Sequence, residues 1–257
     1  MRYYVTADVH GYYSQLITAL TNAGYFEDSE PHKLIICGDF FDRGEEAKKL
    51  QDFLLELLAR DEVILIRGNH EDLALALLND WHHKSYLQSQ HHLNGTMDTL
   101  CQLTDMTTGQ VYQNTDYAAL MYMKSPYIQK IIPATTDYFE TAHYIFVHGW
   151  IPCKVKSTGN DQRAYSPVQD WRNAGSAAWS KARWVNGMEA AHNGITVPGK
   201  TLVCGHWHCS FGHARYEHHG GEFHNADFSP YYGDGIIALD ACTPASGKVN
   251  CIVIEDE

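Results

Sequence analysis

The chain has 257 residues, enough to bury the core of one large domain or two small ones without disulfide bonds. Its 31 acidic residues outnumber the 19 lysines and arginines, and the formal net charge of −12 argues against non-specific nucleic-acid binding. Seven cysteines without a CxxC pair indicate reduced thiols. The sequence also shows no apparent signal segment and no run near ~18 apolar residues. Together these observations favour a cytoplasmic protein without membrane association.

The first 80 residues repeat one pattern three times, namely a short apolar strand, a polar loop and a helix. We expect the strands at residues 2–6, 33–37 and 63–66, and the helices at 12–22, 45–60 and 72–79. This alternation is typical of parallel βαβ units. The three polar loops should therefore meet at the carboxyl edge of one sheet.

Residues 81–138 break this pattern, because they are polar and aromatic with weak helical periodicity. We interpret them as a mostly helical insertion over the site edge of a single domain that spans residues 1–257. Beyond it we expect strands at 143–147, 201–204, 235–239 and 249–255, a helix at 173–188, and irregular loops at 154–170 and 213–234. The last two strands should form a hairpin through residues 243–248.

The loop after the second strand holds two carboxylates and a guanidinium. Its sequence is Cys37-Gly38-Asp39-Phe40-Phe41-Asp42-Arg43-Gly44, and its glycines allow sharp turns. Carboxylates at the carboxyl end of a buried strand are the usual arrangement of a site in an α/β fold. An acidic turn that caps the next helix explains this loop about as well, so the loop alone leaves both interpretations open.

Five strand-ending loops carry side chains able to bind a metal ion. These side chains belong to Asp8, His10, Asp39, Asn69, His148, His206 and His208. Carboxylate, carboxamide and imidazole together favour first-row divalent metals over calcium or a zinc–thiolate site. Seven groups are too many for one ion, and Asp39, whose loop lies between two others in chain order, is the natural bridge between two. Two ions ~3.5–4 Å apart can hold a hydroxide and clamp a phosphoryl group.

A second set of side chains need not bind metal. His70 follows Asn69, and Asp42 can hold its imidazole in one tautomer. Arg43 can bind two phosphate oxygens, and an imidazolium can protonate a leaving alkoxide. A metal hydroxide, a phosphate-binding arginine and a general-acid histidine together predict a phosphoester hydrolase.

These groups lie in five ordered motifs. The motifs are Ala7-Asp8-Val9-His10-Gly11, Gly38-Asp39-Phe40-Phe41-Asp42-Arg43-Gly44, Gly68-Asn69-His70-Glu71, His148-Gly149 and Gly205-His206. They resemble the motifs of calcineurin-like metallophosphoesterases. Arg43, after the second aspartate, and Glu71, after Gly68-Asn69-His70, make these motifs similar to those of the phosphoprotein-phosphatase branch. That branch includes Ser/Thr protein phosphatases, small bacterial and phage phosphatases, and symmetrical dinucleoside-tetraphosphate hydrolases. The resemblance implies a four-layer α/β/β/α sandwich with a dinuclear metal site at the sheet edge.

The resemblance also implies a role for each residue. The first metal would be held by Asp8, His10 and Asp39, and the second by Asp39, Asn69, His148 and His206. His70 would be the general acid, supported by Asp42, while Arg43 and Asn69 would bind the substrate. The family uses a further arginine from a later helix, and Arg183 is our candidate, although a solvated helix face explains Arg183 about as well. We expect two divalent ions, manganese first, with iron, zinc or nickel as alternatives.

Some features leave alternatives open. His208 is either a seventh ligand or a nearby polar residue, and we favour the second. Gly205-His206-Trp207 together with residues 236–240 resembles the end of bacterial dinucleoside-tetraphosphate hydrolases, whereas residues 228–233 resemble the tyrosine-bearing loop of eukaryotic phosphatases. We expect Trp171, Trp179, Trp184 and Tyr165 to pack internally, with an aromatic wall for a nucleobase as the alternative.

These observations predict a metal-dependent phosphoester hydrolase acting on phosphomonoesters, including phosphoserine or phosphothreonine, in proteins or small molecules. A metal-bridged hydroxide would attack phosphorus directly, with His70 as general acid and no covalent phosphoenzyme. A symmetrical dinucleoside-tetraphosphate hydrolase or another nucleotide phosphohydrolase is the alternative enzyme. An inactive metal-bound binding module is the non-enzyme alternative, disfavoured because the six core ligands and His70 are all present.

Overall fold

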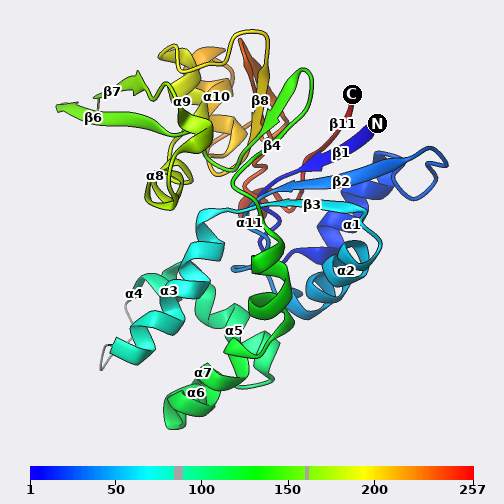
Figure 1. Cartoon of the computed structure of the whole chain (residues 1–257), viewed down its shortest axis with the longest axis vertical. Coiled ribbons are helices and arrows are strands. Elements are labelled where there is room, and N and C mark those ends of the chain that lie inside the picture. Colours follow the sequence, from blue (N-terminus) through cyan, green and yellow to red (C-terminus); the bar gives the residue numbers. More distant parts are fainter. Residues whose placement is uncertain (84–88, 160–161) are drawn as a thin grey trace.

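Two β-sheets face each other at the centre of the molecule, and helices cover the outer side of each (Figure 1). The computed structural model describes residues 1–83, 89–159 and 162–257. The first sheet has the order β11-β1-β2-β3, with strands β1 (Arg2–Thr6), β2 (His32–Cys37), β3 (Val63–Ile66) and β11 (Cys251–Glu255). As predicted, β1, β2 and β3 run parallel, while β11 pairs antiparallel with β1.

The second sheet has the order β4-β5-β8-β10-β9. Its strands are β4 (Phe139–Glu140), β5 (Tyr144–Phe146), β8 (Thr201–Cys204), β9 (Tyr231–Gly233) and β10 (Ile236–Ala238). The three central strands, β5, β8 and β10, are parallel. Their carboxyl ends therefore share one edge, as those of β1 to β3 do in the first sheet.

Alternating side chains bury both faces of each sheet. Val5 and Ile35 of the first sheet join Phe146 and Val203 of the second in one buried cluster. The neighbouring side chain of Tyr4 points the other way, into the core under the helices, because successive strand residues face opposite sides. The first sheet is covered by α1 (Tyr13–Asn22) and α2 (Ala47–Ala59), and the second by α8 (Ser176–Ala182), α9 (Gly187–His192) and α10 (Cys209–Tyr216). The four-layer sandwich is confirmed.

A group of helices follows β3 and extends downward in Figure 1. It comprises α3 (Asn69–His83), α4 (Ser89–Leu93), α5 (Thr96–Thr104), α6 (Thr108–Gln113), α7 (Thr115–Met123), the π-helical turn η1 (Tyr127–Ile131) and the 3₁₀ turn η2 (Ile132–Ala134). Residues 84–88 of the predicted insertion lie outside the described residues. Within the described part of the chain, no helix combines the length and apolar character that crossing a membrane requires.

Two local predictions after residue 150 were wrong. The expected loop at 154–170 contains an antiparallel hairpin of β6 (Cys153–Gly159) and β7 (Gln162–Pro167). Because both strands are polar, the sequence lacks the alternation of apolar and polar residues that would have indicated them. A hydrogen bond from Tyr165 to Glu189 (2.7 Å) connects the hairpin to α9. The expected helix at 173–188 is broken between α8 and α9, because Asn186 accepts the backbone N–H of Glu189 and caps the second helix.

The predicted carboxyl-terminal hairpin was also wrong, since β10 and β11 belong to different sheets. The short helix α11 (Thr243–Ser246) lies between them, and β11 completes the sheet that β1 begins. In the segment expected to be a loop at 213–234, α10 and β9 occupy the two ends. The 3₁₀ turn η3 (Trp171–Asn173) completes the described elements.

Candidate metal centre

The loops after β1, β2, β3, β5 and β8 converge where the two sheets share their carboxyl edge. Backbone hydrogen bonds connect neighbouring loops, from His10 N–H to Asp39 O (2.9 Å) and from Gly205 N–H to His148 O (2.8 Å). A methyl group on Gly38 would lie 2.5 Å from His148 Nδ1. Only glycine therefore allows the two sheets to approach so closely at this point.

Strained backbone is concentrated in these loops. Non-glycine residues with positive φ here are Asp8, His10, Asp39, Asp42, Arg43 and His206. Such conformations cost about 1–3 kcal/mol each and persist where the surrounding structure over-determines them, as at functional sites. The strain thus coincides with the residues that the motifs singled out.

The carboxylate of Asp39 lies between two groups of imidazoles. Its Oδ2 atom is 3.8 Å from Nε2 of both His10 and His70, and its Oδ1 atom is 3.3 Å from Nε2 of His148. The side chain of His206 completes the second group, whose potential ligand atoms lie within 4.8 Å of one another. Each oxygen of Asp39 therefore faces one group, as the predicted bridging role requires.

Hydrogen bonds orient two of these imidazoles. Nδ1 of His10 lies 3.0 Å from the carbonyl oxygen of Phe41, and Nδ1 of His148 lies 2.8 Å from that of Cys37. Because a carbonyl can only accept, both Nδ1 atoms carry the proton and both Nε2 atoms are free to bind metal. Burial lowers the pKa of His10 and of His148, and lowers that of His206 to about 3, so all three rings are neutral near pH 7.

The contacts of His148 Nε2 test whether these residues fit a cation. This atom lies 2.8 Å from Oδ1 of Asn69 and 3.3 Å from Oδ1 of Asp39, so three acceptors face one another. A shared divalent ion would satisfy all three. The donor set and its geometry therefore fit two divalent ions on either side of Asp39.

Asp8 belongs to neither of these two groups, and its carboxylate accepts the backbone N–H of His206 (2.9 Å). Burial, followed by the charges of Asp240 and Asp39, raises the pKa of Asp8 well above its usual value. Burial also raises the pKa of Asp240 to about 6. The buried carboxylates of Asp8, Asp39 and Asp240 repel one another, so nearby positive charge would stabilise their ionised forms. Asp240 was not among the predicted site residues, although it follows a strand at the same edge.

The predicted general acid is held by its predicted partner. Nδ1 of His70 lies 2.7 Å from Oδ2 of Asp42, and both residues are buried. Burial disfavours the charged ring, but Asp39 and Asp42 outweigh it and raise the pKa of His70. The guanidinium of exposed Arg43 lies 3.5 Å from Nε2 of His70. A proton donor and an anion-binding group therefore stand side by side.

Glu71 is a buried carboxylate to which the sequence analysis assigned no role. It accepts the backbone N–H groups of Gly68 (2.7 Å), Asp39 (3.0 Å) and Phe40 (3.0 Å). These bonds fasten the loop after β2 to the start of α3. Its position in the sequence beside Asn69 and His70 was the one feature that could have indicated this role.

Two predicted or considered residues are engaged elsewhere. The buried guanidinium of Arg183 forms ion pairs with Asp72 (2.7 Å) and with Asp137. The imidazole of His208 contacts Ser210 Oγ (2.8 Å) and Glu222 (3.3 Å), as expected of a polar neighbour. The structure thus brings neither residue into the two imidazole–carboxylate groups.

The tryptophans divide into two environments. Trp171 and Trp179 are buried together under the second sheet, as expected. Trp184 is 49% exposed, and its ring centroid lies 5.7 Å from that of His206. Internal packing therefore describes the first two residues but not Trp184.

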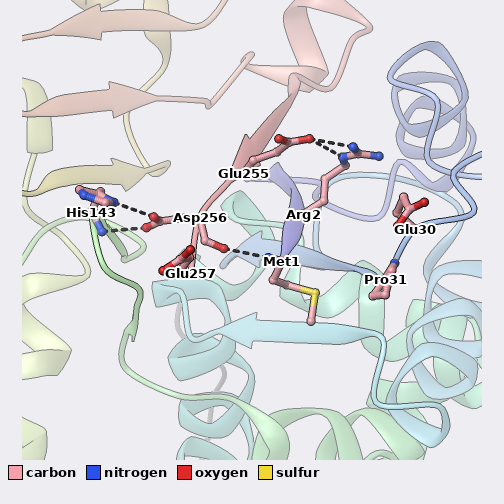
Figure 2. Close-up of a pocket in the computed structure, with 8 residues that line it drawn as sticks. All are labelled: Met1, Arg2, Glu30, Pro31, His143, Glu255, Asp256 and Glu257. Carbon is pink, nitrogen blue, oxygen red and sulfur yellow. Dashed lines mark hydrogen bonds and ion pairs between the residues drawn. The ribbon is translucent and has the colours of Figure 1, made fainter.

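A surface pocket of about 640 Å³ lies away from this centre, where β1 begins (Figure 2). Its charged groups are engaged within the pocket, since the amino group of Met1 donates to the backbone carbonyl oxygen of Asp256 (3.0 Å) and Arg2 binds the carboxylate of Glu255 (2.7 Å). Asp8 lies beyond the opposite end of the same strand. The chemistry of the motifs is therefore not located in this pocket.

Comparisons with known proteins agree with the motifs. The family model described as calcineurin-like phosphoesterase matches residues 1–210. No curated protein matches the chain.

Solved structures of low sequence identity show a similar fold. A candidate diadenosine tetraphosphatase is 14% identical (98% of this chain and 89% of that chain covered, TM-score 0.50). A cold-active protein-tyrosine phosphatase of a psychrophilic Shewanella species is 16% identical (99% and 75% covered, TM-score 0.52). A protein serine/threonine phosphatase from Saccharomyces cerevisiae is 14% identical (100% and 80% covered, TM-score 0.51).

Proposed function

Since the chain belongs to the calcineurin-like phosphoesterase family of metal-dependent phosphoester hydrolases, we propose that it hydrolyses phosphomonoesters, including phosphoserine and phosphothreonine, with manganese as its metal. The observation that supports this choice is the pairing of His70 with Asp42 at 2.7 Å beside the exposed guanidinium of Arg43. A proton donor next to an anion-binding group suits the departure of a poor leaving group from a phosphate monoester.

The residues of the centre divide the work. Asp8, His10 and Asp39 would hold one ion, and Asp39, Asn69, His148 and His206 the other. When bound, two divalent ions would supply activated water and neutralise phosphoryl charge. Arg43 would bind phosphoryl oxygens through its forked guanidinium. Arg183 would bind substrate only after the substrate displaces one of its two carboxylate partners, Asp72 or Asp137.

His70 would donate a proton from Nε2 to the leaving oxygen. Its Nδ1–H remains bonded to Asp42, which keeps the ring in one orientation and favours its charged form. This step requires that the leaving oxygen lie near Arg43, because Nε2 of His70 faces that guanidinium. The reaction needs no covalent phosphoenzyme.

A product assay tests the proposal. The purified protein with manganese is incubated separately with an aryl phosphate, a phosphoserine peptide, a phosphothreonine peptide and diadenosine tetraphosphate. We expect inorganic phosphate from the first three substrates. Nucleoside diphosphate from the tetraphosphate, without phosphate release from the monoesters, would overturn the proposal in favour of a dinucleoside-polyphosphate hydrolase.

A further inference from the structure

Helix α5 presents a buried polar face to the loop that contains Asp42 and Arg43. Thr96 and Thr99 lie on this face, and both are fully buried. Gln102, one turn further along, donates to Gly44 O (2.9 Å) and accepts the N–H of Ala47 (2.9 Å). A buried helix face facing a core is normally apolar, so three polar side chains at this spacing indicate a specific partner.

That partner is above all the carboxylate of Asp42. The hydroxyl of Thr99 donates to Oδ1 of Asp42 (2.7 Å) and accepts its backbone N–H (2.9 Å). The hydroxyl of Thr96 donates to Oδ2 (3.0 Å), the oxygen that lies 2.7 Å from Nδ1 of His70. The two threonines thus fix both the backbone and the carboxylate plane of Asp42.

The same helix supports strained backbone in this loop. Asp42 and Arg43 have φ values of 75° and 66°, which side-chain-bearing residues seldom adopt. Gly95, at the start of α5, packs so closely on Arg43 that any side chain there would collide with the backbone nitrogen of Arg43. Strain of this kind persists only where surrounding contacts hold it, and α5 supplies those contacts.

We propose that Thr96 and Thr99 are positioning residues for proton delivery by His70. They hold the Asp42 carboxylate in the plane that accepts the Nδ1–H of His70, which aims Nε2 at the leaving group. The inference rests on the proposed function, in which His70 is the general acid. It gives the helical segment over the site a part in that step. Without the threonine hydroxyls, Asp42 can rotate away and His70 loses its fixed orientation.

The first test compares leaving groups in the variant Thr99→Val, which removes the hydroxyl and keeps the shape. An alkyl phosphate such as glycerol 2-phosphate needs a proton on its leaving oxygen, whereas p-nitrophenolate departs without one. We expect kcat to fall about tenfold or more on the alkyl phosphate and far less on p-nitrophenyl phosphate, with little change in KM. Thr99→Ser, which restores the hydroxyl, should recover the alkyl activity.

Thr104→Val is the matched control, because Thr104 lies on the same helix and donates only to the carbonyl of Leu100 (2.8 Å). It should leave both substrates unaffected. Equal losses on the two substrates in Thr99→Val, or full alkyl activity, would overturn the inference. If Thr99→Val fails to fold, Thr96→Val provides the same comparison at Oδ2 of Asp42.

A second readout does not depend on activity or metal. The His70 Nδ1 proton, hydrogen-bonded to Asp42, should give a low-field NMR resonance in the metal-free protein, identified by its loss in His70→Asn. We expect this resonance in the unmodified protein and Thr99→Ser, and its broadening or shift in Thr99→Val. An unchanged resonance would contradict the positioning role. Failure of the proposed function would instead appear as no phosphate release from either monoester by the unmodified protein.

Discussion

Oδ1 of Asp39 lies 3.3 Å from Nε2 of His148, although the Nδ1–H of His148 is already donated to the carbonyl oxygen of Cys37. Two acceptors therefore face each other in a buried site, which is unfavourable unless a cation lies between them. The other oxygen of Asp39 stands in the same relation to His10. This relationship makes Asp39 the residue on which metal binding most depends.

Replacing Asp39 by asparagine should empty at least one metal position. The amide has one oxygen in place of two and carries no charge, so it cannot serve both groups of imidazoles. Metal content per chain, measured by elemental analysis after loading with manganese, should fall from two towards one or none. His208→Ala is the control and should keep both ions, since His208 contacts Ser210 and Glu222 instead. Retention of two ions by Asp39→Asn would remove the bridging role.

His70→Asn should reduce turnover of a phosphoserine peptide by about 10²–10⁴-fold, the usual contribution of general acid–base catalysis. Metal content should stay unchanged in the same preparation, because in the proposed mechanism Nε2 of His70, which faces the guanidinium of Arg43, donates a proton and does not bind metal. The steady-state rate and the elemental analysis together separate proton donation from metal binding. Loss of metal in this variant would show that His70 is a ligand.

Glu71→Gln should destabilise the metal-free protein by about 1–3 kcal/mol, because glutamine replaces one of the two accepting oxygens with an NH₂ group that faces backbone N–H donors. Those groups belong to Gly68, Asp39 and Phe40. Urea unfolding monitored by fluorescence measures the free energy of unfolding. Glu56→Gln, at an exposed position on α2, is the control and should change it little. Equal stability of the two variants would show that Glu71 does not hold the loop.

Asp256 should stabilise the fold only above acidic pH. It accepts from Thr141 Oγ (2.6 Å), His143 N (2.7 Å) and His143 Nδ1 (2.7 Å). Because Asp256 directly follows β11 and His143 directly precedes β5, the two bonds from His143, drawn in Figure 2, connect the two sheets. Burial opposes its ionisation, but these bonds prevail and lower its pKa below the unfolded value of 3.8. Its contribution is therefore complete above about pH 4 and is lost as the pH falls further.

The variant Asp256→Asn checks this dependence in the metal-free protein. The difference in free energy of unfolding between the unmodified protein and the variant should be largest near pH 7 and should shrink as the pH falls below 4. Asp98→Asn, at an exposed carboxylate, should show a smaller difference at both ends of the range. A difference that grows on acidification would contradict the sign of the pKa shift.

The layered α/β fold and the convergence of the motif loops could be predicted from the sequence for one reason. Each motif residue follows directly on a short apolar strand, and parallel strands bring their carboxyl ends to the same edge. Local order alone therefore indicated that Asp8, Asp39 and Asn69 would meet. The pairing of Asp42 with His70 was foreseen from the chemistry of imidazole and carboxylate in neighbouring loops.

Other features depend on contacts between distant parts of the chain, and only the tertiary structure decided them. Thr99 lies 57 positions from Asp42, and the sequence around Thr99 does not indicate that it binds that carboxylate. The ion pair of Arg183 with Asp72 spans 111 positions. The place of β11 beside β1, rather than beside β10, likewise depends on an open sheet edge. The sequence by itself determined which chemical groups reach the centre, because that follows from strand order, whereas packing of the helices over the loops decided how those groups are held.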